Sequence, residues 1–196
     1  MALLIPARKR IARPAAVWLT ALGLVAFCGR AQAQSGAIGE YQAKAAYLYN
    51  FIKFVEWPTG ALHGPEEAIR VCVLGADSFG RELDGMMEGR KINGRGVAVL
   101  HMRTAKAVRD CHVVFISASE QDRARDLLGN SAGPPTLTVG ESQTFCKLGG
   151  MISFVMEEDK LRFEVNQLSA EQAHLHISSK LLSLARSVYV AEKKGL

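Results

Sequence analysis

The sequence has only four cysteines, and no two of them are close together. Cysteine-based zinc sites use pairs a few residues apart, so the spacing excludes that class of metal site. The chain also has no internal repeat, no low-complexity tract and no linker-like segment. These absences favour one folded domain, for which we predict no metal and no cofactor.

The sequence also lacks a hydrophobic run long enough to cross a bilayer comfortably. Its best candidate, VWLTALGLVAFC, precedes the small and polar residues that end in Ala31-Gln32-Ala33. Four basic residues come before that run: Arg8, Lys9, Arg10 and Arg13. This order is typical of a secretory signal peptide over residues 1–33. We predict cleavage after Ala33, loss of Cys28 with the signal, and a mature protein that is not inserted in the membrane.

The predicted mature chain has little net charge. The whole sequence carries 24 Lys and Arg against 19 Asp and Glu, a net charge of +5. Residues 1–33 contain five basic residues and no acidic one, so 19 of each sign remain in residues 34–196. A balanced chain gives no electrostatic reason to expect nucleic acid. Its length fits a single domain.

Residues 75–82, GADSFGRE, are the segment most similar to an enzymatic motif, because they link a predicted strand to a predicted helix. A phosphate-binding loop needs lysine and then serine or threonine after its second glycine. Here Arg81 and Glu82 take these places, and the carboxylate would repel phosphate. We predict an ordinary turn, with Asp77 or Ser78 capping the helix that follows.

His174 and His176 are candidate metal ligands, since residues two apart share one face of an extended segment. No cysteine or carboxylate with recognisable ligand spacing completes such a site. We therefore predict that both histidines lie at the surface or serve packing.

Two further groups of polar residues have simple interpretations. Ser178 and Ser179 lack the G-x-S-x-G surroundings of a nucleophilic serine and are expected to cap a helix. The acidic residues Glu157, Glu158 and Asp159 fall at a predicted hairpin turn, where charge is normally solvated. We predict no catalytic residue and a protein that is not an enzyme.

The segment YQAKAAYLYNFIKFVEWP predicts an amphipathic helix that ends at Pro58. Its apolar stripe is expected to face the core and contains Tyr41, Ala45, Leu48, Phe51, Ile52 and Val55. Trp57 lies at the end of this segment. It is expected either to remain partly exposed as an anchor for a partner or to be buried as a staple.

The middle of the chain alternates strands and helices. We predict strands at residues 69–75, 93–102, 112–118 and 135–141, and helices at 77–89 and 119–130. This alternation predicts an α/β fold: a single domain with a mostly parallel open sheet flanked by helices.

The last third has a different pattern. Residues 151–166 form two period-two runs around an acidic turn, which predicts an antiparallel hairpin, and residues 169–190 are predicted to be largely helical. In the hairpin, Leu161, Phe163 and Val165 are expected to face the core. The alternate side chains should meet water or a partner: Arg162, Glu164 and Asn166.

Cys72 and Cys111 each lie at the front of a predicted strand, and these strands can be neighbours. A bond between them would close a loop of about 40 residues and stabilise the fold by ~4 kcal/mol, less any strain. The alternative is two buried free thiols. In the first case Cys146 is the unpaired thiol.

Several segments, in this order, resemble the YfiR family of periplasmic proteins: KAAYLYNFIKFVEWP, VCVLG, CHVVFIS, FCKLGGMISFVMEEDKLRFEVN and HISSKLLSLARSV. The resemblance covers nearly all of the mature chain. It implies a periplasmic, non-enzymatic regulator that binds the periplasmic domain of an inner-membrane diguanylate cyclase and holds it inactive. Cyclic-di-GMP and biofilm formation would then rise when repression is lifted.

The resemblance also bears on the cysteines. It implies a disulfide between Cys72 and Cys111. Some relatives have a second bridge from the cysteine matching Cys146 to one a few residues on, where this chain offers Ser153. We therefore expect no second intramolecular bridge here.

Other readings of the sequence remain open. One is a small-ligand-binding module that signals to another membrane sensor such as a histidine kinase, since the strand ends of an open α/β sheet form crevices. A hydrolase is a more distant alternative. The apolar content and the spare Cys146 are compatible with a homodimer.

Overall fold

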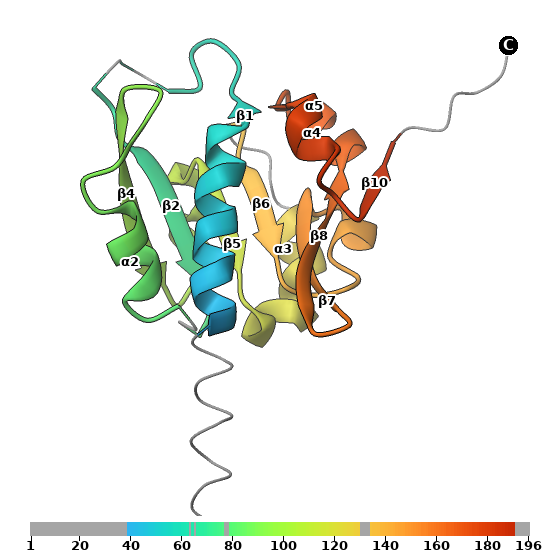
Figure 1. The fold of residues 1–196 in the computed structure, drawn as a ribbon. Coiled ribbons are helices and arrows are strands. Elements are labelled where there is room, and N and C mark those ends of the chain that lie inside the picture. The colour runs from blue at the N-terminus through green and yellow to red at the C-terminus, as the bar shows by residue number, and fades with distance from the viewer. Residues whose placement is uncertain (1–38, 63, 65, 77–78, 130–133, 191–196) are drawn as a thin grey trace, which may run out of the picture. The chain divides into compact units, whose positions relative to one another are not determined.

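The computed structural model describes residues 39–190 except 63, 65, 77–78 and 130–133 (Figure 1). The predicted signal peptide, with its cleavage site and Cys28, lies outside the described residues, as do Asp77 and Ser78. Within the described part, none of the helices is long and apolar enough to cross a membrane.

Eight strands form one sheet in the order β10-β8-β7-β6-β5-β2-β4-β3. Five of the seven neighbouring pairs are parallel, and the antiparallel pairs are β7 with β8 and β3 with β4. This confirms the predicted α/β fold and the C-terminal hairpin. The strands are β2 Ile69–Leu74, β3 Lys91–Ile92, β4 Arg95–Met102, β5 Val113–Ile116, β6 Leu137–Gly140, β7 Ile152–Glu157, β8 Lys160–Asn166 and β10 Ser187–Tyr189.

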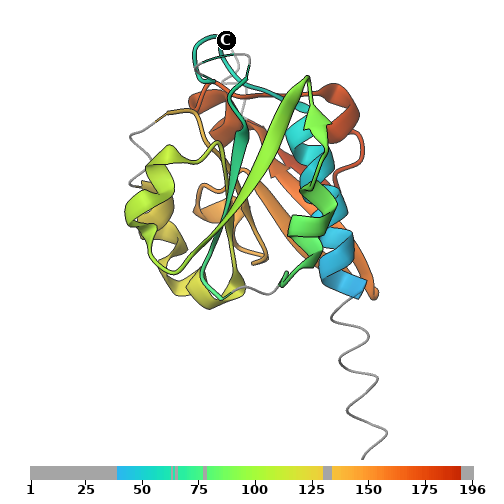
Figure 2. The same ribbon diagram turned by 90° about the vertical axis from the view of Figure 1, so that its left-hand side faces the viewer.

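Helices cover both sides of the sheet. Figure 2 shows the first helix and α2 on one side and α3 on the other. The first helix spans residues 39–53. The shorter helices are α2 Glu82–Met87, η1 Ala105–Asp110, η2 Ala118–Arg123, α3 Ala124–Gly129, η3 Cys146–Leu148, α4 Gln167–Gln172 and α5 Ser179–Leu182.

The side of the sheet that packs against the first helix, here called the helix face, holds the larger core. The predicted apolar stripe is confirmed, with Ala45, Leu48, Phe51, Ile52 and Val55 buried and Tyr41 packed against the same core. Aromatic rings join the helix to the hairpin, because the Phe51 ring lies 5.4 Å from that of Phe154 and 5.0 Å from that of Phe163. Burial of these rings is the main source of stability on this face.

The opposite side of the sheet, here called the bridge face, holds a smaller core. It contains Cys72, Leu74, Cys111, Val114, Ile116, Ala124 and Phe145. Phe145 packs over this core, and its ring lies close to Gly140. A Cβ atom at position 140 would be only 2.5 Å from the ring of Phe145. Only glycine therefore fits at the end of β6.

The first helix is shorter than predicted. It ends at residue 53, and Val55–Glu56 form a short strand, β1, paired antiparallel with β9, His176–Ile177. Because Val55 and Glu56 pair with β9, they cannot continue the helix. The helix therefore ends ahead of Pro58, through a tertiary contact that the sequence pattern did not predict.

The prediction that residues 169–190 are largely helical was wrong. Two short helices, α4 and α5, alternate with the strands β9 and β10. The other predicted helices are also reduced: α2 begins only at Glu82, and the segment after β5 is 3-10 helix up to Arg123.

Candidate partner-binding surface

Exposed large apolar side chains of the described residues are most frequent in the last third of the sequence. Of its six exposed large apolar residues, only Leu100 on β4 lies in the first two thirds of the sequence. The other five, with their exposed fractions, are Met156 46%, Leu168 37%, Leu184 62%, Val188 37% and Val190 61%. Single exposed apolar residues are normal, but a concentration in one region is typical of an interaction surface.

The strand β10 forms one edge of the sheet. It pairs parallel with β8 through Ser187 to Glu164, Val188 to Val165 and Tyr189 to Asn166. No described strand pairs with its other side. An edge strand offers unpaired backbone N–H and C=O groups to another chain. We refer to β10, Leu184 and Val190 together as the β10 edge.

Glu164, on the neighbouring strand β8, holds β10 in place through its carboxylate. Its carboxylate accepts a hydrogen bond from the Tyr189 hydroxyl at 3.0 Å and lies 3.7 Å from an Nη1 atom of Arg186. Arg186 also lies 3.1 Å from a carboxylate oxygen of Glu157 at the end of β7. Three strands are thus joined through one buried carboxylate and one arginine.

This arrangement changes the pKa of neighbouring groups. Burial, and then the hydrogen bond and negative charge of Glu164, raise the pKa of the Tyr189 phenol. Burial, and then the charge of Glu164, raise the pKa of the Cys146 thiol to about 12. Both groups are therefore neutral at ordinary pH.

The three hairpin residues expected to meet water or a partner have different positions. Arg162 is exposed. Glu164 is only 7% exposed, because β10, which the sequence did not predict, covers it. Asn166 is half-buried, where its side chain caps α4 by accepting from the Ser169 N–H and donates to the Cys146 carbonyl. Of the three, only Arg162 is exposed, and the other two hold β10 and α4 in position.

Trp57 is half-buried and packs against the helix-face core. Its indole Nε1 is buried and has no hydrogen-bond partner among the described residues. It borders a groove of about 430 Å³ with Leu62, Ile69 and Arg95. Trp57 therefore contributes to the core while leaving an unused donor beside this groove.

The Cys72–Cys111 disulfide is present, with the two Cα atoms 6.0 Å apart. It joins β2 to the segment just before β5, which are neighbours in the sheet. This confirms the bond between Cys72 and Cys111 that was predicted from the neighbouring strands. A disulfide of this kind suits an oxidising compartment.

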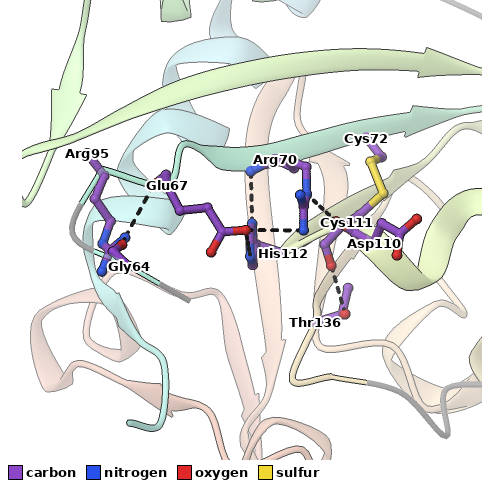
Figure 3. Close-up of polar contacts among 9 residues, drawn as sticks. All are labelled: Gly64, Glu67, Arg70, Cys72, Arg95, Asp110, Cys111, His112 and Thr136. Atoms are coloured by element: carbon purple, nitrogen blue, oxygen red, sulfur yellow. Dashed lines mark hydrogen bonds and ion pairs between the residues drawn. A yellow bond between two sulfur atoms is a disulfide. The ribbon is translucent and has the colours of Figure 1, made fainter. Parts of the chain in front are cut away.

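A polar network lies beside this bridge, at the start of β2 and β5 (Figure 3). The ring Nδ1 of His112 accepts from the Arg70 N–H at 2.9 Å, so its ring hydrogen lies on Nε2, 3.9 Å from Glu67. Arg70 also lies 3.3 Å from Glu67 and donates to the carbonyl of Asp110. The network fixes the chain entering both strands and so positions Cys111. No periodic pattern in the sequence predicted this network.

The Thr136 hydroxyl extends this network to β6, since it donates to the Cys111 carbonyl at 2.9 Å (Figure 3). On the other side of the network, Arg95 donates to the carbonyls of Gly64 and Glu67. These bonds tie the loop before β2 to β4.

The first helix is joined to the carboxyl end of β6 by a buried carboxylate. Glu141, directly after β6, accepts from Lys44 at 2.6 Å, from Tyr41 at 3.0 Å and from the Ala118 N–H at 2.7 Å. Burial alone would lower the pKa of Lys44, but its hydrogen bonds to Glu141 and Glu40 raise it. The lysine is therefore a charged, buried link between the first helix and the sheet.

Cys146 is a buried free thiol, within reach of the Met151 and Glu164 carbonyls. Ser153 is fully buried nearby and donates to the Ser142 carbonyl at 2.5 Å. The serine thus has its own structural bond where some relatives are expected to carry a cysteine.

The remaining candidate residues are surface or capping groups. His174 and His176 are exposed, and the described residues contain no cluster that could hold a metal. Ser178 caps α5 by accepting from the Leu181 N–H, as predicted. Glu158 and Asp159 form the hairpin turn.

Two solved structures share part of the architecture. One is a conserved domain protein from Vibrio cholerae O1 biovar eltor, with TM-score 0.44 and 11% identity. The other is an ABC domain from Streptococcus pneumoniae in complex with L-Trp, with TM-score 0.46 and 8% identity. Each match covers 61% of this chain and 54% of the other, so this chain spans about half the length of either structure. Likenesses at these TM-scores do not bear on function.

The profile of the YfiR/HmsC-like family matches residues 41–186. This range includes the first helix, the Cys72–Cys111 bridge and the hairpin, and it ends one residue before β10. A match over most of the chain supports a periplasmic regulator of the YfiR type in general terms. The chain belongs to the YfiR/HmsC-like family.

Proposed function

We propose that this protein binds the periplasmic domain of an inner-membrane diguanylate cyclase and represses it, which lowers cyclic-di-GMP and biofilm formation. The β10 edge is the contact surface, together with Arg162. The observation that carries the proposal is the exposure of Leu184, Val188 and Val190 along an edge strand in a chain of the YfiR/HmsC-like family.

Repression follows from differential affinity. A protein that binds the inactive state of a sensor more tightly than the active state shifts the population toward the inactive state. The β10 edge suits such binding because its free backbone can extend the sheet and its apolar side chains can be buried. Glu164 and Asn166 act indirectly, since they hold β10 and α4.

Trp57 belongs to the same proposal as a secondary contact. Its buried indole N–H would gain a partner if an acceptor from the sensor entered the neighbouring groove. Aromatic residues with such a donor are common anchors in interfaces.

The first experiment is capture of partners by the mature protein, residues 34–196, from solubilised membranes of its own host. We expect mass spectrometry to identify a diguanylate cyclase with a periplasmic domain. Deletion of the gene should raise cyclic-di-GMP. Unchanged cyclic-di-GMP, or capture of a histidine kinase in place of a cyclase, would refute the repressor assignment.

A matched pair of substitutions tests the surface itself. Val188 and Leu100 are both strand residues, with exposed fractions of 37% and 40%, but they lie on β10 and β4. Val188→Asp should weaken binding to the purified sensor domain at least tenfold and derepress the cyclase. Leu100→Asp should leave both unchanged. Equal effects of the two variants would show that the β10 edge is not the contact.

Self-association is the competing use of the same edge. Two copies could pair through β10 and bury the same apolar side chains. Sedimentation of wild-type protein and Val188→Asp separates the two cases. If Val188→Asp dissociates a wild-type dimer and leaves sensor binding unchanged, the β10 edge is the homodimer interface.

A further inference from the structure

A cavity of about 1070 Å³ lies over the bridge face and is lined in part by residues of α3 and α4. Leu74, Val114 and Ile116 form its floor, and each is at least 96% buried. Its walls include Leu127 and Leu128 of α3. Binding pockets for small molecules usually measure about 300–1,000 Å³, so this space is large enough for a ligand.

The lining of the cavity is mixed, and its apolar part is mainly aliphatic, made of leucine, valine and isoleucine side chains. The described residues around it include no Phe, Tyr or Trp, in contrast to the aromatic core of the helix face. Flat aromatic ligands usually stack on rings, which this lining does not offer. An alkyl chain is the group that a wall of leucine, valine and isoleucine accommodates best.

The rim of the cavity is basic. Arg109, Arg123 and Arg125 line it against a single carboxylate, Asp126. Arg123 is paired with Glu120 at 3.0 Å, whereas Arg109 and Arg125 have no ion pair among the described residues. Residues 34–196 as a whole are balanced in charge, so this excess of arginine is local.

We propose that this cavity binds an amphiphile with an alkyl chain and one anionic head, of which a medium-chain fatty acid is the simplest example. The alkyl chain lies over the floor of β2 and β5, and the head meets Arg109 and Arg125. Arginine is well suited to this position because its guanidinium group can pair with a carboxylate through two hydrogen bonds. Apolar burial supplies affinity, and the arginines select the charge.

The test uses decanoate on the purified mature protein, with decanol and decyltrimethylammonium as probes of the same chain length. A ligand that binds only the folded protein raises its Tm. We expect decanoate to raise Tm and to give a saturable heat of binding in calorimetry. Decanol should bind at least tenfold more weakly, and decyltrimethylammonium should not bind. Equal affinity for decanoate and decanol would overturn the role of the arginines and with it the proposal.

Three variants locate the site. The double variant Arg109→Gln/Arg125→Gln should weaken decanoate binding at least tenfold, whereas Arg81→Gln removes an exposed arginine elsewhere and should have no effect. Leu128→Trp places a bulkier side chain in the wall of the cavity and should weaken decanoate binding while the protein still unfolds cooperatively. Decanoate binding that survives both the double variant and Leu128→Trp would overturn the proposal, as would no binding to wild-type protein at millimolar decanoate.

An acidic protein segment is the rival occupant of the rim. A glutamate-rich peptide that binds the wild type, loses affinity in the arginine double variant and is indifferent to Leu128→Trp would assign the arginines to a protein contact, and the fatty-acid site would be wrong. These measurements use the protein alone, so their outcome is separate from that of the diguanylate cyclase experiments.

Discussion

On its helix face the sheet is covered by one long helix and a cluster of aromatic rings, whereas on its bridge face it is covered by short helices, a disulfide and an open cavity. The helix face is stabilised by burial of large side chains, which needs no particular redox state. The bridge face has fewer buried residues and depends on a covalent bond and on polar networks. One sheet thus supports a large packed core on one side and leaves a cavity on the other.

The largest effect is expected from breaking the helix face. Phe51→Ala removes a fully buried ring that contacts Phe154 and Phe163. The free energy of unfolding should fall by about 3–5 kcal/mol, measured in urea. Asn50→Ala, on the exposed side of the same helix, should change it by less than about 0.5 kcal/mol. Similar losses in the two variants would contradict the assignment of the core.

Removal of the disulfide tests the bridge face. Cys72→Ala/Cys111→Ala opens a connection across 39 residues, which should lower the free energy of unfolding by up to about 4 kcal/mol. Hydrogen exchange should accelerate most in η1 and α3, which cover that face, and least in the first helix. Uniform acceleration over both faces would show that the two are not separately stabilised.

Three of the strands that the sequence predicted share a simple property. Each of β2, β5 and β6 is a compact apolar run that is buried on both sides, so its identity does not depend on which strand lies next to it. The stripe of the first helix was predictable for a similar reason, since its period alone defines the buried side. Elements with a strong local pattern were therefore assigned correctly.

The missed elements depend on contacts far apart in the sequence. The two residues of β1 pair with β9 more than 100 positions away, and two-residue strands have no detectable period. Burial of Glu164 follows from the arrival of β10, and burial of Lys44 follows from Glu141, 97 residues on. A polar residue in a strand or helix looks solvent-facing until its distant partner is known.

The thiol of Cys146 should make stability depend on alkaline pH. Its pKa is raised from 9.0 to about 12 by burial and by Glu164, so the folded protein keeps a proton that the unfolded chain releases above pH 9. This contribution is complete below pH 9 and is lost as pH rises toward 12, by about 1.4 kcal/mol per pH unit. Urea unfolding at several pH values should show a shallower decline for Cys146→Ala. Parallel pH profiles would contradict this role of the thiol.

The smallest effect is expected at the β10 edge itself. Tyr189→Phe removes the hydroxyl that donates to Glu164 at 3.0 Å, while the ring and the strand pairing stay in place. A single hydrogen bond of this kind contributes about 0.5–1.5 kcal/mol, and one to a charged acceptor lies at the upper end. The loss should be local, because Arg186 still balances the carboxylate.

Hydrogen exchange should therefore accelerate in β10 and in neighbouring β8 without a change in the first helix. Ser187→Ala serves as the control on the same strand. If exchange in β10 is unchanged, Glu164 does not hold this edge, and its burial must instead serve the packing around Cys146.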